Sequence, residues 1–412
     1  MHPNSDRRNG NIFVWSFLLV YLSAPVRYIG IAQAALCDKL GSSALVSNLP
    51  TAGYFFAAIG PIFFAYLVPN RWQLKAVIWS GWGITVLSGL AAAVLFLPFP
   101  NEVRVAVIVV QSLLLGILSS GQQLFLLQCL GRGTTDNGRA RALKLAFSLG
   151  PLGAVAGSLG AQFILNGGFH WLSFPRDFGV LYLVGSVCSV AMLWKCTEFD
   201  LPPIVDVAPT RFFLFLKESI GRFVHSRDMA YLWLAYFMWY ATFLVLPNLT
   251  LFARHAMGRE PADFSGLMMA IQFGSKAVAG YACGVLYQRY GVRAPLVATV
   301  MALGGSLLWA WAVPGYYYLA AFALMGAGQL GGFYFPNVLL SWSSSANAAR
   351  DMAVLNLSVV VASPAPALPG GVTDRWGFPA SFVLGILTAV MGLVLVLRLS
   401  TRRDREVSLP PA

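Results

Sequence analysis

Charged side chains are scarce in this sequence. Aspartate, glutamate, lysine and arginine make up 11% of its 412 residues, against about 25% in an ordinary soluble domain. Apolar residues make up 58% of the chain, and the mean hydropathy is +0.68. A soluble fold could not cover that much apolar surface with so few charges. The composition therefore excludes a soluble enzyme, a disordered chain and a disulfide-stapled secreted domain, and it indicates a polytopic membrane protein.

Patterns typical of metal, redox and ATP chemistry are also missing. The five cysteines show no CxxC spacing, and the four histidines fall at or beyond the ends of the expected helices, so a metal site or a disulfide has little basis. No G-x-x-x-x-G-K-[ST] segment is present, so the sequence does not indicate ATP hydrolysis. Since no histidine or carboxylate cluster is expected at membrane depth, we expect no enzyme, no cofactor and no bound metal.

Long apolar runs dominate what is present. A membrane-spanning helix needs about 20 mostly apolar residues. Such runs predict an all-α protein with twelve spans, at about residues 12–36, 47–69, 75–97, 104–130, 143–167, 179–195, 229–253, 264–288, 294–313, 316–341, 353–373 and 379–398.

The one long polar stretch between these runs divides the chain. It covers residues 196–228 and contains an amphipathic segment, 211–226, which is typical of an interfacial helix. We therefore predict two pseudo-symmetric six-helix bundles, one within 1–195 and the other within 229–412, and the second range also includes a short cytoplasmic tail. A cytoplasmic connector, 196–228, would join them.

Lysine and arginine are distributed unevenly between the two sides of the membrane. When the spans alternate, 20 of the 28 basic residues fall on the side of the termini and six on the other side, with Arg27 and Lys276 inside spans. The positive-inside rule then places both termini in the cytoplasm of a cell whose inner or plasma membrane holds the protein. The net charge of +12 is explained in this way, so we expect no nucleic acid as a partner.

The charges expected inside the membrane are positive. All 16 acidic residues lie in loops or at span ends, whereas Arg27 follows Pro25 in the first span and Lys276 lies near the middle of the eighth. Ionisable groups at this depth are costly and usually functional, and arginine suits carboxylate or phosphate groups. We predict that the two cations clamp an anionic substrate between the halves. The alternative is that each cation snorkels or bonds to helix carbonyls.

Uncharged polar and aromatic residues near mid-span supply further candidate substrate contacts. They are Gln122, Gln123, Trp239, Tyr240, Asn248, Gln329 and Asn337. For each of them, packing inside the bundle is the competing interpretation. Asp38, at the end of the first span, is the acid best placed to carry a proton if protons drive transport.

A basic loop pattern occurs in both halves, with Arg71 after the second span. Its second copy comprises Gly284, Gln288, Arg289, Gly291 and Arg293. Six-helix repeats joined by a connector, together with these loops, resemble the major facilitator superfamily of transporters. The loop motif of that family is approximately G-x-x-x-D-R-x-G-R-R, and here Gln288 replaces the acid that helps to latch the cytoplasmic side. We interpret these residues as a gating motif that lacks its charge.

The resemblance implies a secondary active transporter that works by alternating access. We expect a small anionic or zwitterionic solute as the substrate, H⁺ or Na⁺ as candidate coupling ions, a lipid bilayer as the surroundings, and a monomer. Two alternatives stay open. One is an exporter of amphiphilic compounds or drugs, which would fit an aromatic cavity but normally carries an intramembrane acid. The other is a non-transporting sensor or receptor on the same fold.

Overall fold

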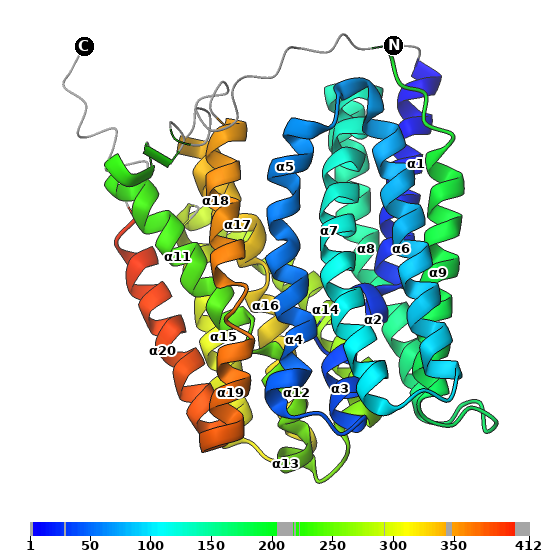
Figure 1. The fold of residues 1–412 in the computed structure, drawn as a ribbon. Helices are drawn as coiled ribbons and strands as arrows, with labels where there is room; N and C mark the ends of the chain where they lie inside the picture. The colour runs from blue at the N-terminus through cyan, green and yellow to red at the C-terminus, as the bar shows by residue number, and fades with distance from the viewer. Residues whose placement is uncertain are drawn as a thin grey trace.

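A computed structural model of the protein describes residues 3–28, 30–203, 217, 220–221, 223–291, 293–342 and 348–399. Every regular element in these ranges is helical, which confirms the all-α prediction (Figure 1). Most of the amphipathic segment expected at 211–226 lies outside the described residues. The domain boundaries after residues 195 and 228 stay a prediction.

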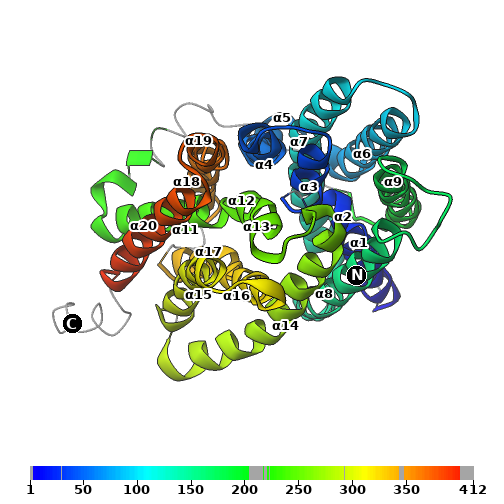
Figure 2. The same cartoon turned by 90° about the horizontal axis from the view of Figure 1, so that it is seen from below.

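The helices fall into two groups, which lie side by side when the molecule is seen from below (Figure 2). The first group is α1 (Pro3–Leu22), α2 (Ala24–Arg27), α3 (Ala32–Lys39), α4 (Ala44–Phe56), α5 (Gly60–Leu67), α6 (Gln73–Phe96), α7 (Asn101–Gly133), α8 (Asp136–Leu165) and α9 (Arg176–Cys196). The second is α11 (Arg227–Phe243), α12 (Leu246–Leu251), α13 (Ala253–Met257), α14 (Ser265–Tyr290), α15 (Arg293–Ala312), α16 (Ala320–Gly328), α17 (Gly331–Trp342), α18 (Ala348–Ala362), α19 (Ala367–Trp376) and α20 (Phe378–Leu397).

The helix α1 begins, and α20 ends, at the same end of the molecule (Figure 1). We call this the termini end and the opposite one the far end. The far end holds α3, α12, α13, the start of α4 and the end of α19 (Figure 1).

Eight helical segments in the described part of the chain are long and apolar enough to cross a membrane. They coincide with predicted spans three to seven, nine, eleven and twelve. The other four predicted spans, 12–36, 47–69, 264–288 and 316–341, are largely helical as well but are not among those eight. The structure thus shows a multi-pass architecture, and it does not fully confirm the count of twelve.

Three of those four spans are interrupted, and two of the interruptions occur at residues that disfavour a continuous helix. The first span breaks after the short α2. Gly30 follows with a φ of +148°, a backbone angle that glycine adopts readily and other residues rarely do. The second passes through a 3₁₀ turn before Gly60 and Pro61, and proline cannot supply the hydrogen bond that a helix interior needs. The tenth is divided at residues 329–330, between α16 and α17.

The helix α6 shows two chemically different faces. Trp79, Trp82, Val86 and Leu90 recur every three or four residues, so they share one face, and each is more than half exposed. The positions on the buried side include Val77, Gly81, Ile84, Ser88 and Ala91. An exposed apolar stripe of this length is what a helix presents to lipid.

A carboxylate of the second group caps a helix of the first group at the far end. Asp374, in the last turn of α19, accepts hydrogen bonds from the backbone N–H groups of Ala44 and Leu45, each at 2.9 Å. These groups belong to the first turn of α4, where a negative charge also interacts favourably with the helix dipole. Gly370 allows this approach, since a Cβ there would lie 2.8 Å from the Cα of Leu45.

Two further polar contacts join the halves at the same end. Arg254 donates to Asp38 Oδ2 at 2.8 Å and to Glu260 Oε2 at 2.6 Å. Asn48 donates through Nδ2 to Asn248 Oδ1 at 2.6 Å, in a fully buried position. The Nδ2 of Asn48 and both amide atoms of Asn248 have partners here, whereas Asn48 Oδ1 is buried without one among the described residues. The far end is therefore closed by contacts between α4 and α19, between α3 and α13, and between α4 and α12.

Candidate binding site

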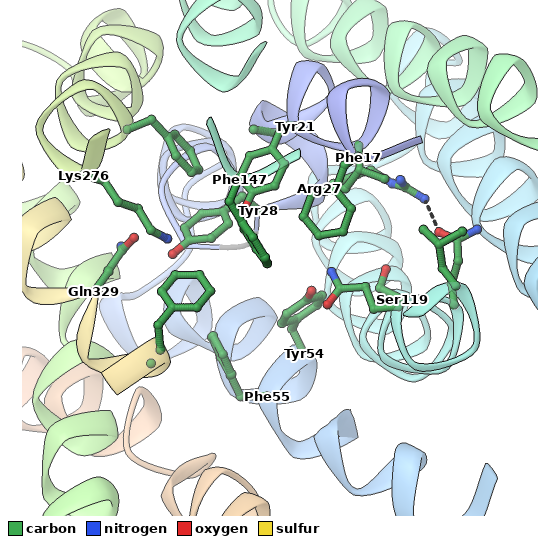
Figure 3. A pocket seen from close by; sticks show the side chains of 18 of the residues that line it. Phe17, Tyr21, Arg27, Tyr28, Tyr54, Phe55, Ser119, Phe147, Lys276 and Gln329 are labelled. Carbon is green, nitrogen blue, oxygen red and sulfur yellow. Dashed lines mark hydrogen bonds between the residues drawn. The ribbon is translucent and has the colours of Figure 1, made fainter. Parts of the chain in front are cut away.

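A cavity of about 430 Å³ lies between the two groups of helices (Figure 3). Eleven of its 23 described lining residues are aromatic, whereas aromatic residues make up 14% of the chain. The rings are Phe17, Tyr21, Tyr28, Tyr54, Phe55 and Phe147 from the first group, and Trp239, Tyr240, Phe243, Phe273 and Phe333 from the second. A mostly apolar wall with a few polar groups is typical of a small-molecule site.

Arg27 brings a positive charge into this cavity from the first group. It ends α2, whose start is favoured by Pro25 near the helix N-terminus. The residue is 7% exposed, and its Nη2 donates to Gln122 Oε1 at 3.2 Å. Its Nε is buried and has no hydrogen-bond partner among the described residues. The structure therefore gives this guanidinium a neutral amide as its hydrogen-bond partner.

Lys276 brings a second positive charge from α14. Its Nζ lies 5.4 Å from the ring centroid of Phe333 and 5.9 Å from that of Phe273, a weak cation–π arrangement. Figure 3 shows the side chain extending toward Gln329, which is 4% exposed. Both amide atoms of Gln329 lack a hydrogen-bond partner in the part of the chain that is described. Each half thus contributes one cation, with Gln122 and Gln123 from the first half and Gln329 from the second.

Most of the substrate contacts expected from the sequence come together here. Seven of the nine line the cavity, namely Arg27, Gln122, Gln123, Trp239, Tyr240, Lys276 and Gln329. Trp239 uses its Nε1 to donate to the carbonyl of Gly328 at 3.0 Å, so its indole N–H is already engaged. What these residues bind stays a prediction.

The other two expected contacts lie elsewhere. Asn248 is held at the far end, where it accepts from Asn48 and donates to Thr373 Oγ1 at 2.8 Å. Asn337 is exposed on α17, one turn beyond the cavity residue Phe333. The sequence predicts both near the middle of a span. Each follows a proline, Pro247 or Pro336, and a proline can bend a helix so that the next residues no longer face the cavity.

The expected coupling acid, Asp38, takes part in the far-end contacts. Burial raises the pKa of its carboxyl group, and the nearby Glu260 carboxylate adds to this, whereas Arg254 lowers it. The pKa of Arg254 is itself raised, first of all by its hydrogen bond to Glu260. Asp38 is therefore a group that binds a proton more readily than an exposed aspartate does.

All six expected gating residues lie at or beside the termini end, namely Arg71, Gly284, Gln288, Arg289, Gly291 and Arg293. Gly291 has a φ of +77°, which suits the tight turn between α14 and α15. Arg293 donates to the carbonyl of Leu397 in the same half. Their role in gating stays a prediction.

The far-end cap at Asp374 was missed by the sequence reasoning. The order Gly370-x-x-x-Asp374-Arg375-x-Gly377 contains the acid that is replaced at Gln288. This match to the loop motif was the signal that could have found it. Asp374 lies in the last turn of α19, at the far end, whereas the loop motif is expected at the termini end.

No protein-family model and no curated protein sequence matches this chain. Solved structures do match it over nearly its whole length. The nucleoside transporter NupG covers 96% of this chain and 98% of its own, with 12% identity and a TM-score of 0.69. A peptide transporter of the POT type, in complex with sulfate, covers 94% and 93%, with 15% identity and a TM-score of 0.70.

A D-xylose–proton symporter is also similar, covering 95% of this chain and 96% of its own, with 13% identity and a TM-score of 0.69. At such low identity the likeness establishes the fold. The chain has the fold of the major facilitator superfamily transporters, as its sequence predicted.

Proposed function

We propose that this protein is a secondary active transporter of a small organic anion. The observation that carries the proposal is a cavity between the two halves that holds Arg27 and Lys276, with no carboxylate among its described lining residues. Charges buried away from water need partners. Since the described lining offers them amides and rings, a bound anion is the natural counter-charge.

Alternating access explains the rest of the arrangement. In this mechanism two bundles move about a central site and expose it to one side at a time. The far-end contacts of Asp374, Arg254 and Asn248 join the halves on one side of the cavity. They correspond to the closed gate of one state. If both termini are cytoplasmic, as the basic residues favour, this closed gate faces outward.

An exporter of amphiphilic compounds is the second candidate. It is favoured by the eleven aromatic rings around the cavity, which would suit an apolar ligand. It is disfavoured for cationic compounds, because Arg27 and Lys276 would repel them. A receptor on the same fold would bind the anion without moving it.

The test is a ligand screen followed by a flux measurement. Purified protein is first screened by thermal shift against organic anions, zwitterionic amino acids, sugars and cationic amphiphiles. Ligands that stabilise it are then offered to proteoliposomes under imposed H⁺ or Na⁺ gradients. We expect stabilisation by organic anions and uptake that Arg27→Gln lowers by about 100-fold. Binding without flux would indicate a receptor, and stabilisation by cationic amphiphiles alone would contradict the proposal.

A further inference from the structure

We infer, on the basis of the proposed function, that the substrate is an organic anion with two polar ends and an aromatic body. One end would carry a carboxylate or similar anion that meets Arg27 and Gln122. The other would carry a second anionic or acceptor group that meets Lys276 and Gln329. The rings of the cavity would enclose the part between them.

Unused hydrogen-bond donors mark the two ends. Arg27 Nε and Gln122 Nε2 are buried without partners at the first end, and Gln329 Nε2 is buried without one at the second. Lys276 adds an ammonium for which the described residues provide ring contacts. Leaving buried donors unpaired is unfavourable. A ligand with an acceptor group at each end would give both cations a charged or polar partner.

The two cations do not converge on one point. In Figure 3 the guanidinium of Arg27 turns toward Gln122, away from Lys276, and Tyr28 and Phe147 lie between the two cations in this view. A single compact anion, such as a lone carboxylate, would therefore meet one cation and leave the other unpaired. Two separate acceptor groups on one molecule fit this arrangement better.

The walls between the ends are built from rings of both halves. Tyr28 packs against Phe273 with centroids 5.0 Å apart, and Phe147 against Phe333 at 5.6 Å, both in T-shaped geometry. Aromatic ligands add favourably to such edge-to-face walls. Six of the eleven rings are phenylalanines, which offer the hydroxyl groups of a polyol no hydrogen-bond partner. The body of the ligand is therefore aromatic rather than sugar-like.

The test is a set of matched probes on purified wild-type protein, measured by isothermal titration calorimetry. The aromatic diacids are terephthalate, naphthalene-2,6-dicarboxylate and biphenyl-4,4′-dicarboxylate, which sample three lengths. Their single-ended counterparts are benzoate, 2-naphthoate and biphenyl-4-carboxylate. Suberate is the aliphatic diacid. We expect at least one aromatic diacid to bind about tenfold more tightly than its own monoacid and than suberate, since a hydrogen bond to a charged group contributes about that factor.

A variant separates the two ends. Lys276→Gln should reduce the affinity for the best diacid to about that of its monoacid and leave the monoacid almost unchanged. Asn337→Gln, an exposed position outside the cavity, is the matched control and should change neither. Because the probe set works on wild-type protein, the inference remains testable if Lys276→Gln does not fold.

Each unfavourable outcome has a distinct meaning. Equal affinity for diacids and monoacids would overturn the two-ended substrate, and equal affinity for suberate would overturn the aromatic body. In both cases the anion transporter would stand. Failure of every carboxylate to bind, with stabilisation by neutral or cationic compounds instead, would overturn the proposed function itself.

Discussion

Two arginines of this protein, Arg254 and Arg27, differ in the hydrogen-bond partners that the protein gives them. Arg254, at the far end, donates to the carboxylates of Asp38 and Glu260. Arg27, in the cavity, donates to the amide of Gln122 and has a buried Nε without a partner in the described structure. The first arginine is satisfied by the protein. The second, in our proposal, is completed by the bound anion.

The side-chain amides repeat this difference. Asn248 uses both of its amide atoms, one toward Asn48 and one toward Thr373. Gln329 uses neither, within the part of the chain that is described. The polar contacts named at the far end join the two halves, whereas Arg27 and Gln329 in the cavity each keep polar atoms without a hydrogen-bond partner in the described structure. Testing this difference requires variants in the cavity and variants at the far end.

The largest effect is expected from Arg27→Gln. Removing a charged hydrogen-bond donor from the cavity should lower uptake of an anionic substrate in proteoliposomes by about 100-fold. Arg27→Lys should restore only part of it, because an ammonium cannot reproduce the guanidinium fork. Arg254→Gln is the matched control and should keep substrate affinity. If Arg254→Gln lost affinity as strongly, the two arginines would not differ in the proposed way.

A moderate effect is expected from Asp374→Asn. The variant keeps one acceptor for the first turn of α4 but loses the charge and the second acceptor, which should weaken the closed far end by up to about 1 kcal/mol. That changes the ratio of closed to open molecules by roughly fivefold. Spin labels at positions 102 and 317, near the starts of α7 and α16, should report a larger open population. Glu198→Gln, whose pair with Lys195 lies within one half, should leave the distance distribution unchanged.

A smaller effect is expected from Asp38→Asn, and it depends on pH. Because the pKa of Asp38 is raised by burial, the folded protein binds this proton more readily than the unfolded chain. The stability that this contributes is present at low pH and is lost as the pH rises through the raised pKa. Wild-type protein should thus lose melting temperature relative to Asp38→Asn over that range. If protons drive transport through Asp38, the variant should also show weaker proton dependence; unchanged coupling would remove Asp38 from the mechanism.

The smallest effect is expected from Asn337→Ala. Its side chain is exposed and lies outside the cavity, and surface substitutions usually change stability by less than about 0.5 kcal/mol. Uptake and melting temperature should both match the wild type. A clear loss of affinity would show that the binding site extends along α17 toward the termini end.

The sequence was sufficient for the fold and for the two charges of the cavity. Run lengths located the helices because a bilayer dictates how many apolar residues a span needs. Arg27 and Lys276 stood out because charges at membrane depth are rare. Both signals are local, so they can be read without knowing which helices meet.

The rest of the site depends on contacts that the sequence does not encode locally. Phe55 lines the cavity whereas its neighbour Phe56 is 54% exposed, and in a membrane both faces of a helix are apolar. The cap of α4 by Asp374 joins residues about 330 positions apart. Neither hydropathy nor periodicity distinguishes these partners, so the ring-lined wall and the far-end closure were visible only in three dimensions.

The most direct test of the account is the affinity of purified, monodisperse Arg27→Gln protein for an aromatic diacid such as naphthalene-2,6-dicarboxylate. If Arg27 binds the anion, the dissociation constant should rise by about 100-fold over wild type while the melting temperature of the unliganded protein stays close to that of the wild type. If Arg27 serves only to pack α2, the melting temperature should fall and the surviving protein should bind with wild-type affinity. That second result would contradict the central claim that the cavity holds its substrate through this arginine.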